Sequence, residues 1–159
     1  VTEGLVRNVP RKGLFVIELT PERIADLVDV REVLERLAVE KCIERIDDEG
    51  VERLGEIVHA IEENLAKENF RECNELDGVF HQEIASRAAN TKLVKFLKEI
   101  EDFMHIARAM EKRVMARERV EISLKEHRDI FTAIQRRDRR GAVEAVIRNI
   151  ETLKKNLGV

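Results

Sequence analysis

Residues 120–157 read VEISLKEHRDIFTAIQRRDRRGAVEAVIRNIETLKKNL, and this stretch decides the fold. Its apolar residues recur every three or four positions on both sides of a short polar turn near Asp138, which is the period of an amphipathic α-helix. Two helices joined by so short a turn pack against each other in opposite directions. The sequence therefore predicts an antiparallel helix pair, with one helix over about 120–137 and the other over 139–157.

The same helical period runs through most of the preceding sequence. Thr20 followed by Pro21 is typical of a helix N-cap and the first helical residue, and the first helix is expected to reach about Ile46. Its predicted inward face carries Ile24, Leu27, Val30, Leu34, Leu37 and Ala38. Further helices are expected from residue 47 or 48 to at least 65, over 69–89 and over 92–115. The predicted fold class is all-α, an antiparallel bundle of about six helices.

The opening of the chain has a different pattern. Residues 4–9 and 14–17 are short β-prone runs, and Pro10-Arg11-Lys12-Gly13 between them is a turn sequence. A lone two-stranded hairpin is only marginally stable unless it packs on something else. We therefore expect residues 1–19 to be the end of another domain that precedes this one, and residues 20–159 to form the helical domain.

The composition narrows the class of protein. The 159 residues suit one compact domain, and a formal charge of −3 argues against a chain that coats nucleic acid by bulk electrostatics. No apolar run approaches the roughly 18 residues of a membrane span, and no signal peptide is recognised, so we expect a cytoplasmic protein with no membrane partner. Cys42 and Cys73 lie in helical patterns and are expected to be reduced, buried thiols.

Polar residues lie on the apolar face of the helix expected over 69–89. At 100° per residue, Asp77 and His81 fall within the same arc as Cys73, Phe80 and Ile84. A buried Asp without a partner is costly, so something must compensate it. A divalent metal would do so, and Asp-x3-His on one helical face is a spacing that suits metal ligands. A buried Asp–His hydrogen bond is the alternative.

Two polar residues of the C-terminal helix pair point into the same core. His127 and Asn149 each share the apolar face of their own helix. His127 lies 11 residues before Asp138 and Asn149 lies 11 residues after it, so an antiparallel pair places them side by side. Asp77, His81, His127 and Asn149 are therefore predicted to converge at one level of the bundle, and their convergence favours a metal site.

The order and spacing of these residues resemble a known family. The pattern Asp77-x3-His81, followed by Glu126-His127 and by Ala133-Ile134 with Asp138, looks like the FCD domain of FadR-subfamily GntR transcription regulators. Arg31-x2-Leu34-Glu35 also fits that domain. Three further segments resemble the wing hairpin of the winged-helix DNA-binding domain in these regulators: Glu3-Gly4-Leu5-Val6, Pro10-Arg11-Lys12-Gly13 and Phe15-Val16.

The resemblance implies a ligand set. FCD domains are helical bundles that dimerise and bind a small effector, often a carboxylate, and many members hold a divalent metal with one Asp and three His. By position, the ligands here are Asp77, His81 and His127, and Asn149 stands where the family usually has the fourth ligand, a His. An amide oxygen binds a borderline metal less well than imidazole does. Zn or Ni is the expected metal, and Mn also fits.

The resulting hypothesis is the effector-sensing domain of a transcription regulator. An organic acid would coordinate the metal and meet Arg31, whose planar fork suits carboxylates, although an ordinary ion pair with Glu35 is the alternative role for Arg31. Effector binding would then change the spacing of two winged-helix domains in a homodimer. Operator DNA would be bound only through that N-terminal domain, with phosphate contacts from Arg7, Arg11 and Lys12.

Two other functions remain compatible with the same residues. An Asp-His-His metal centre with open positions could activate water, as in a hydrolase. We find no further inward acid or base placed for proton transfer, so we expect that the chain is not an enzyme. The third function is a metal-free dimerisation module, in which Asp77 pairs with His81 or His127.

Overall fold

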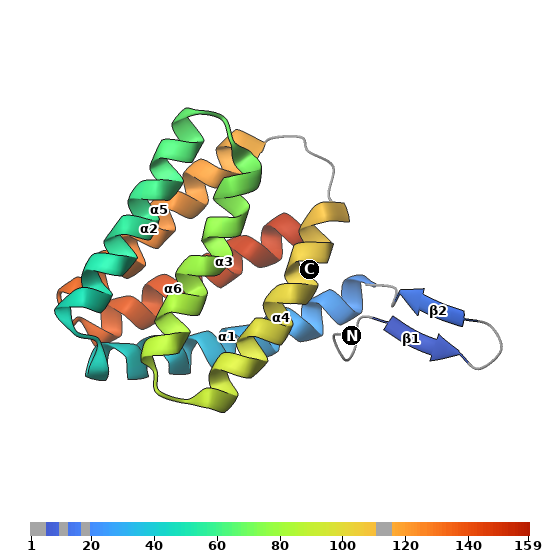
Figure 1. The fold of residues 1–159 in the computed structure, drawn as a ribbon, viewed down its shortest axis with the longest axis horizontal. Coiled ribbons are helices and arrows are strands. Elements are labelled where there is room, and N and C mark those ends of the chain that lie inside the picture. Colours follow the sequence, from blue (N-terminus) through green and yellow to red (C-terminus); the bar gives the residue numbers. More distant parts are fainter. Residues whose placement is uncertain (1–5, 10–12, 17–19, 111–115) are drawn as a thin grey trace.

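The computed structural model describes residues 6–9, 13–16, 20–110 and 116–159, and over these ranges it forms a bundle of six α-helices beside two short strands (Figure 1). The helices are α1 (Pro21–Arg45), α2 (Asp48–Ala66), α3 (Phe70–Arg87), α4 (Thr91–Met110), α5 (Ala116–Gln135) and α6 (Arg139–Leu157). The prediction of a bundle of six helices is confirmed. The helix expected over 92–115 is described only as far as Met110.

Helix α3 lies in the middle of the bundle (Figure 1). It contacts α1, α2, α4 and α5, whereas α6 packs against α1 and α5. The side chains of α3 can therefore meet residues from several helices at once. No helix in the described part of the chain combines the length and the apolar character that crossing a membrane requires.

The turns between helices form where the sequence predicts them. Thr20 accepts a hydrogen bond from the backbone N–H of Arg23, and Asp47 accepts one from Gly50, so both act as N-caps. Helix α5 is followed by Arg137, whose φ is 57°, and Asp138 then caps α6 by accepting from the backbone N–H of Gly141. This tight connection makes α5 and α6 antiparallel neighbours, as predicted.

The inward face of α1 agrees with the predicted one only in part: Ala38 is buried, and Ile24, Leu27 and Leu34 pack against the core. Val30 is 53% exposed and Leu37 is 37% exposed, so the prediction that both face the core is wrong. The buried side of α1 carries Val28, Arg31, Glu35, Ala38, Val39, Cys42 and Ile43. The buried face is rotated away from Val30 and Leu37 toward Val28 and Val39, and it has the charged pair Arg31 and Glu35 near its centre, which a search for apolar residues alone does not find.

Most of the buried side chains of the described helices are apolar, and the two cysteines are among them. Phe80, Leu54, Met104, Ile130 and Ile134 are among the largest fully buried side chains. Cys42 and Cys73 are free and buried, as expected. Burial raises the pKa of Cys42 to about 12, because the apolar surroundings disfavour the thiolate.

At the N-terminal end, β1 (Val6–Val9) pairs antiparallel with β2 (Gly13–Val16), and Val6 lies opposite Val16. Arg11 and Lys12, two of the three residues predicted to contact DNA phosphates, lie outside the described residues. Arg7 is described only as part of the backbone of β1. The assignment of residues 1–19 to a winged-helix domain stays a prediction.

Candidate metal centre

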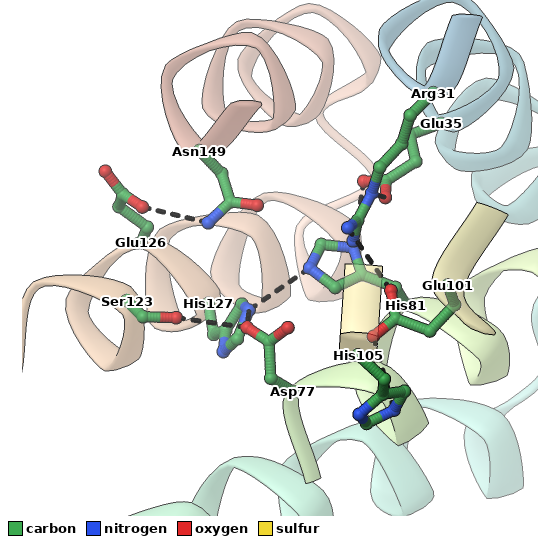
Figure 2. A network of polar contacts seen from close by, with 10 residues as sticks. All are labelled: Arg31, Glu35, Asp77, His81, Glu101, His105, Ser123, Glu126, His127 and Asn149. Atoms are coloured by element: carbon green, nitrogen blue, oxygen red, sulfur yellow. Dashed lines mark hydrogen bonds and ion pairs between the residues drawn. The ribbon is translucent and has the colours of Figure 1, made fainter. Parts of the chain in front are cut away.

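Three of the four predicted ligands come together between α3 and α5. The Nε2 atom of His127 lies 3.2 Å from Nε2 of His81 and 3.2 Å from Oδ1 of Asp77 (Figure 2). One donor atom from each of the three residues fits within a span of 4.8 Å. His127 is 1% exposed and His81 is 7% exposed, and Asp77 is partly buried. The arrangement brings three metal-binding side chains together, two of them buried and the third partly buried.

The spacing of these atoms suits a metal ion. Zn–N and Zn–O bonds of about 2.0–2.1 Å in tetrahedral geometry place neighbouring ligand atoms about 3.3 Å apart. The two measured separations of 3.2 Å are close to that value. Two imidazoles that face each other through Nε2 also leave at least one lone pair directed at the space between them. The residues present therefore fit a divalent metal.

Two neighbouring contacts hold the ligands in place. The hydroxyl of Ser123, on α5, donates to Oδ1 of Asp77 over 3.2 Å. The His127 ring packs against Phe80 with ring centroids 4.6 Å apart. Nδ1 of His127 is buried and has no hydrogen-bond partner among the described residues. The orientation of His127 is therefore set by its packing and by the contacts of Nε2.

Glu35 reaches from α1 to His81. Its Oε2 lies 2.9 Å from Nδ1 of His81, and its Oε1 accepts a hydrogen bond of 2.6 Å from Nε of Arg31. Burial works against the charge on Glu35, but Arg31 and His81 outweigh it and lower its pKa to about 2. Burial also works against a charged His81, and Glu35 nevertheless raises the pKa of His81. The carboxylate favours a proton on Nδ1 and so leaves Nε2 facing His127.

Arg31 is bound by two carboxylates from different helices. Besides Glu35, it contacts Glu101 of α4, with 3.2 Å between Nη1 and Oε2. All three side chains are buried. Although burial opposes the guanidinium charge, Glu35 and Glu101 raise its pKa. The ion pair considered for Arg31 is thus present, and its proposed contact with an effector remains untested.

Asn149 is buried on α6, and Figure 2 draws it together with the other three residues. Its Nδ2 donates a hydrogen bond of 2.9 Å to Oε2 of Glu126, on α5. The hydroxyl of Thr152 donates to the other oxygen of Glu126 over 2.5 Å. Figure 2 shows the amide oxygen of Asn149 pointing away from Glu126.

The roles of Glu101, Ser123 and Glu126 were not predicted from the sequence. Glu101 could have been found from the sequence, because it lies at helical spacing between Leu97 and Met104, both of which are buried. Ser123 and Glu126 are on faces that the apolar period does not select. Their contacts with Asp77 and Asn149 are seen only when α5 is packed against α3 and α6.

A family model described as the FCD domain matches residues 26–152. The chain belongs to the FCD family. It is 28% identical over 148 residues to the Bacillus subtilis protein named uncharacterized HTH-type transcriptional regulator YdhC, covering 91% of this chain and 64% of that protein. It is 26% identical over 157 residues to the gluconate operon transcriptional repressor of Bacillus subtilis, covering 96% and 64% of the two chains. The FCD chain thus spans somewhat less than two thirds of either relative.

Solved structures show the same fold. Escherichia coli McbR/YncC superposes with a TM-score of 0.83 at 16% identity, covering 98% of this chain and 77% of that one. A structure described as the metal-free FCD domain of TM0439 superposes with a TM-score of 0.69 at 17% identity, covering 89% of this chain and 95% of that one. The two Bacillus subtilis relatives are named as a transcriptional regulator and a transcriptional repressor.

Proposed function

We propose that this FCD domain senses an effector for a GntR-type transcription regulator and holds a divalent metal with Asp77, His81, His127 and Asn149. The observation that carries the proposal is the pair of buried Nε2 atoms and the carboxylate oxygen that face one another at 3.2 Å in the middle of the bundle. A structure described as metal-free in the same family fits a domain that is able to hold a metal. Zn or Ni is the expected ion, with Mn as a further candidate.

The proposed effector is a small organic acid. The metal supplies a Lewis-acid centre for a carboxylate. Arg31 supplies a buried cation near the same place, but it is already engaged by Glu35 and Glu101. An acid that reaches Arg31 therefore competes with Glu101, and this competition links effector binding to the position of α4.

The proposal extends to the whole regulator. We expect it to act in the cytoplasm as a homodimer, in which effector binding alters the spacing of two winged-helix domains on operator DNA. Residues 1–19 would be the end of that domain, with Arg7, Arg11 and Lys12 against the phosphates. The relatives, which include a repressor of the gluconate operon, support a role in transcription.

Elemental analysis of the purified protein tests the metal centre. We expect about one transition-metal ion per chain, and none in the Asp77→Ala, His81→Ala double variant. Glu75→Ala, at an exposed position on the same helix, is the matched control and should keep the metal. A wild-type protein that stays metal-free after incubation with Zn, Ni and Mn would leave a metal-free dimerisation module as the better description.

The effector is tested on the metal-loaded protein. A panel of small carboxylates should raise its melting temperature, and the double variant should not respond to the same compounds. Equal responses from both proteins would place the binding elsewhere on the domain.

A further inference from the structure

The structure carries one inference about Asn149, and it rests on the metal centre proposed above. We propose that Glu126 fixes the Asn149 amide with its oxygen toward the metal, so that the centre has two nitrogen and two oxygen ligands and is selective for harder divalent ions than a centre with three imidazoles. Glu126 is then a positioning residue that acts through Asn149. Asn149 itself determines which metal is preferred.

The direction of the amide follows from its partner. An ionised carboxylate has no hydrogen to donate, so only the NH₂ side of an amide can face it. Nδ2 of Asn149 lies 2.9 Å from Oε2 of Glu126, in agreement with this rule. A flipped amide would place its oxygen against the carboxylate oxygen. The Oδ1 atom is therefore held on the opposite side, as Figure 2 shows.

Glu126 is itself held from α6. Thr152 lies three residues after Asn149 on that helix, and its hydroxyl donates to Oε1 of Glu126 over 2.5 Å. The two carboxylate oxygens thus each accept a hydrogen bond from one helical turn of α6. Because Glu126 precedes His127 directly in the chain, the same segment of α5 positions one ligand by a hydrogen bond and supplies another.

The chemical consequence is a change in metal preference. Imidazole nitrogens favour Zn and Ni, whereas carboxylate and amide oxygens favour harder ions such as Mn. With an oxygen from Asn149, the donor set is two imidazoles, one carboxylate and one neutral amide. Such a set should bind Zn less tightly than a set with a third imidazole, and it should lose much less affinity for Mn.

The test measures the Kd of Zn and of Mn for the metal-stripped protein by competition with chromophoric chelators. Asn149→His should tighten Zn binding by about tenfold or more and change Mn binding much less, so the ratio of the two constants shifts. Asn149→Leu should weaken both metals. Glu126→Gln should weaken both by about tenfold, because the Gln amide can also donate to Asn149 and no longer fixes its direction.

A double variant separates positioning from general damage to the fold. If Glu126 acts through Asn149, adding Glu126→Gln to Asn149→Leu should have no further effect on either Kd. Glu121→Gln, at an exposed position on the same helix, is the control and should match wild type. Circular dichroism should show the same helix content for every variant.

The outcomes distinguish the two levels of the proposal. Wild-type protein that binds neither metal would overturn the metal centre and this inference with it. Wild-type protein that binds metal, together with an Asn149→Leu variant that binds it equally well, would overturn the role of Asn149 alone. An unchanged Zn-to-Mn ratio in Asn149→His would overturn the assignment of selectivity, and wild-type affinity in Glu126→Gln would overturn the positioning role.

Discussion

Helices α2 and α3 pack against each other and have 19 and 18 residues, but they bury different kinds of side chain. The buried residues of α2 are Gly50, Leu54, Ile57, Val58, Ile61 and Leu65. The buried set of α3 includes His81 among Cys73, Phe80 and Ile84, and Asp77 lies partly buried one turn before His81. Helix α2 is built for packing, whereas α3 also brings ionisable groups into the core.

The difference shows how a polar group is tolerated inside a bundle. The polar residues of α3 are met by partners from other helices, namely Glu35 of α1 and both Ser123 and His127 of α5. Each contact offsets part of the cost of burial and also fixes a position. Single substitutions in other helices should therefore disturb the buried polar residues of α3. The effects of such substitutions on stability and metal binding can be compared with those of a substitution in α2.

The largest effect is expected for Glu35→Ala. This change removes the buried carboxylate shared by Arg31 and His81, and removing one partner of a buried ion pair costs about 3–5 kcal/mol. Urea denaturation of the metal-free protein measures the free energy of unfolding. Glu44→Ala, an exposed position on the same helix, is the control. A loss below about 1 kcal/mol for Glu35→Ala would contradict the view that α3 depends on this contact.

Leu54→Ala tests the other helix. Truncating a fully buried leucine leaves a cavity and should lower the free energy of unfolding by about 2–5 kcal/mol. Metal affinity should stay near the wild-type value, because α2 contributes no ligand. Denaturation and metal titration on the same variant give both quantities. A large loss of metal affinity in the folded variant would show that the two helices are not separable in this way.

Metal removal should lower the stability of the folded protein. At a free metal concentration of about 100 times the Kd, binding stabilises the folded protein by about 2.7 kcal/mol, and a chelator should abolish this gain. The Asp77→Ala, His81→Ala double variant should show no response to the chelator. Melting curves with and without chelator provide the measurement, and an equal response from both proteins would contradict the ligand assignment.

The smallest effect concerns the apolar side of the core, at Cys42. Its folded pKa of about 12 lies above the ordinary value of 9.0, so the folded state keeps the proton more tightly. The resulting stability is fully present below pH 9 and is lost as the pH rises toward 12. The loss should reach about 2 kcal/mol near pH 10.5. Cys42→Ala should show a shallower decline between about pH 7.5 and 10.5, and parallel curves would contradict the prediction.

The sequence predicted the fold well because helical periods and caps are local signals. Thr20, Asp47 and Asp138 cap their helices as their residue types indicate. The start of α5 was less well predicted: the helix begins at Ala116, four residues before the expected position. Apolar period defines the middle of a helix, and the polar first turn of α5 has no such period.

The candidate site was predicted only in part, for a physical reason. Asp77, His81 and His127 stood out because they interrupt apolar faces. Glu35 and Glu126 act across helices, and their partners depend on the rotation of α1 and α5 about their axes. The error at Val30 and Leu37 has the same origin, because the sequence alone did not show how far α1 is rotated toward the side that carries Arg31 and Glu35.

Because α1 is long, a small tilt of the helix about Glu35 displaces its N-terminal end by a larger distance. Glu35 lies fourteen residues from Pro21, which is about 21 Å along the helix axis. A tilt of about 5° around Glu35 would displace the start of the helix by about 2 Å. The contact between Glu35 and His81 is therefore a point about which a small tilt of α1 leaves the nearby packing almost unchanged. The same tilt displaces the start of α1, at Pro21, by a larger distance.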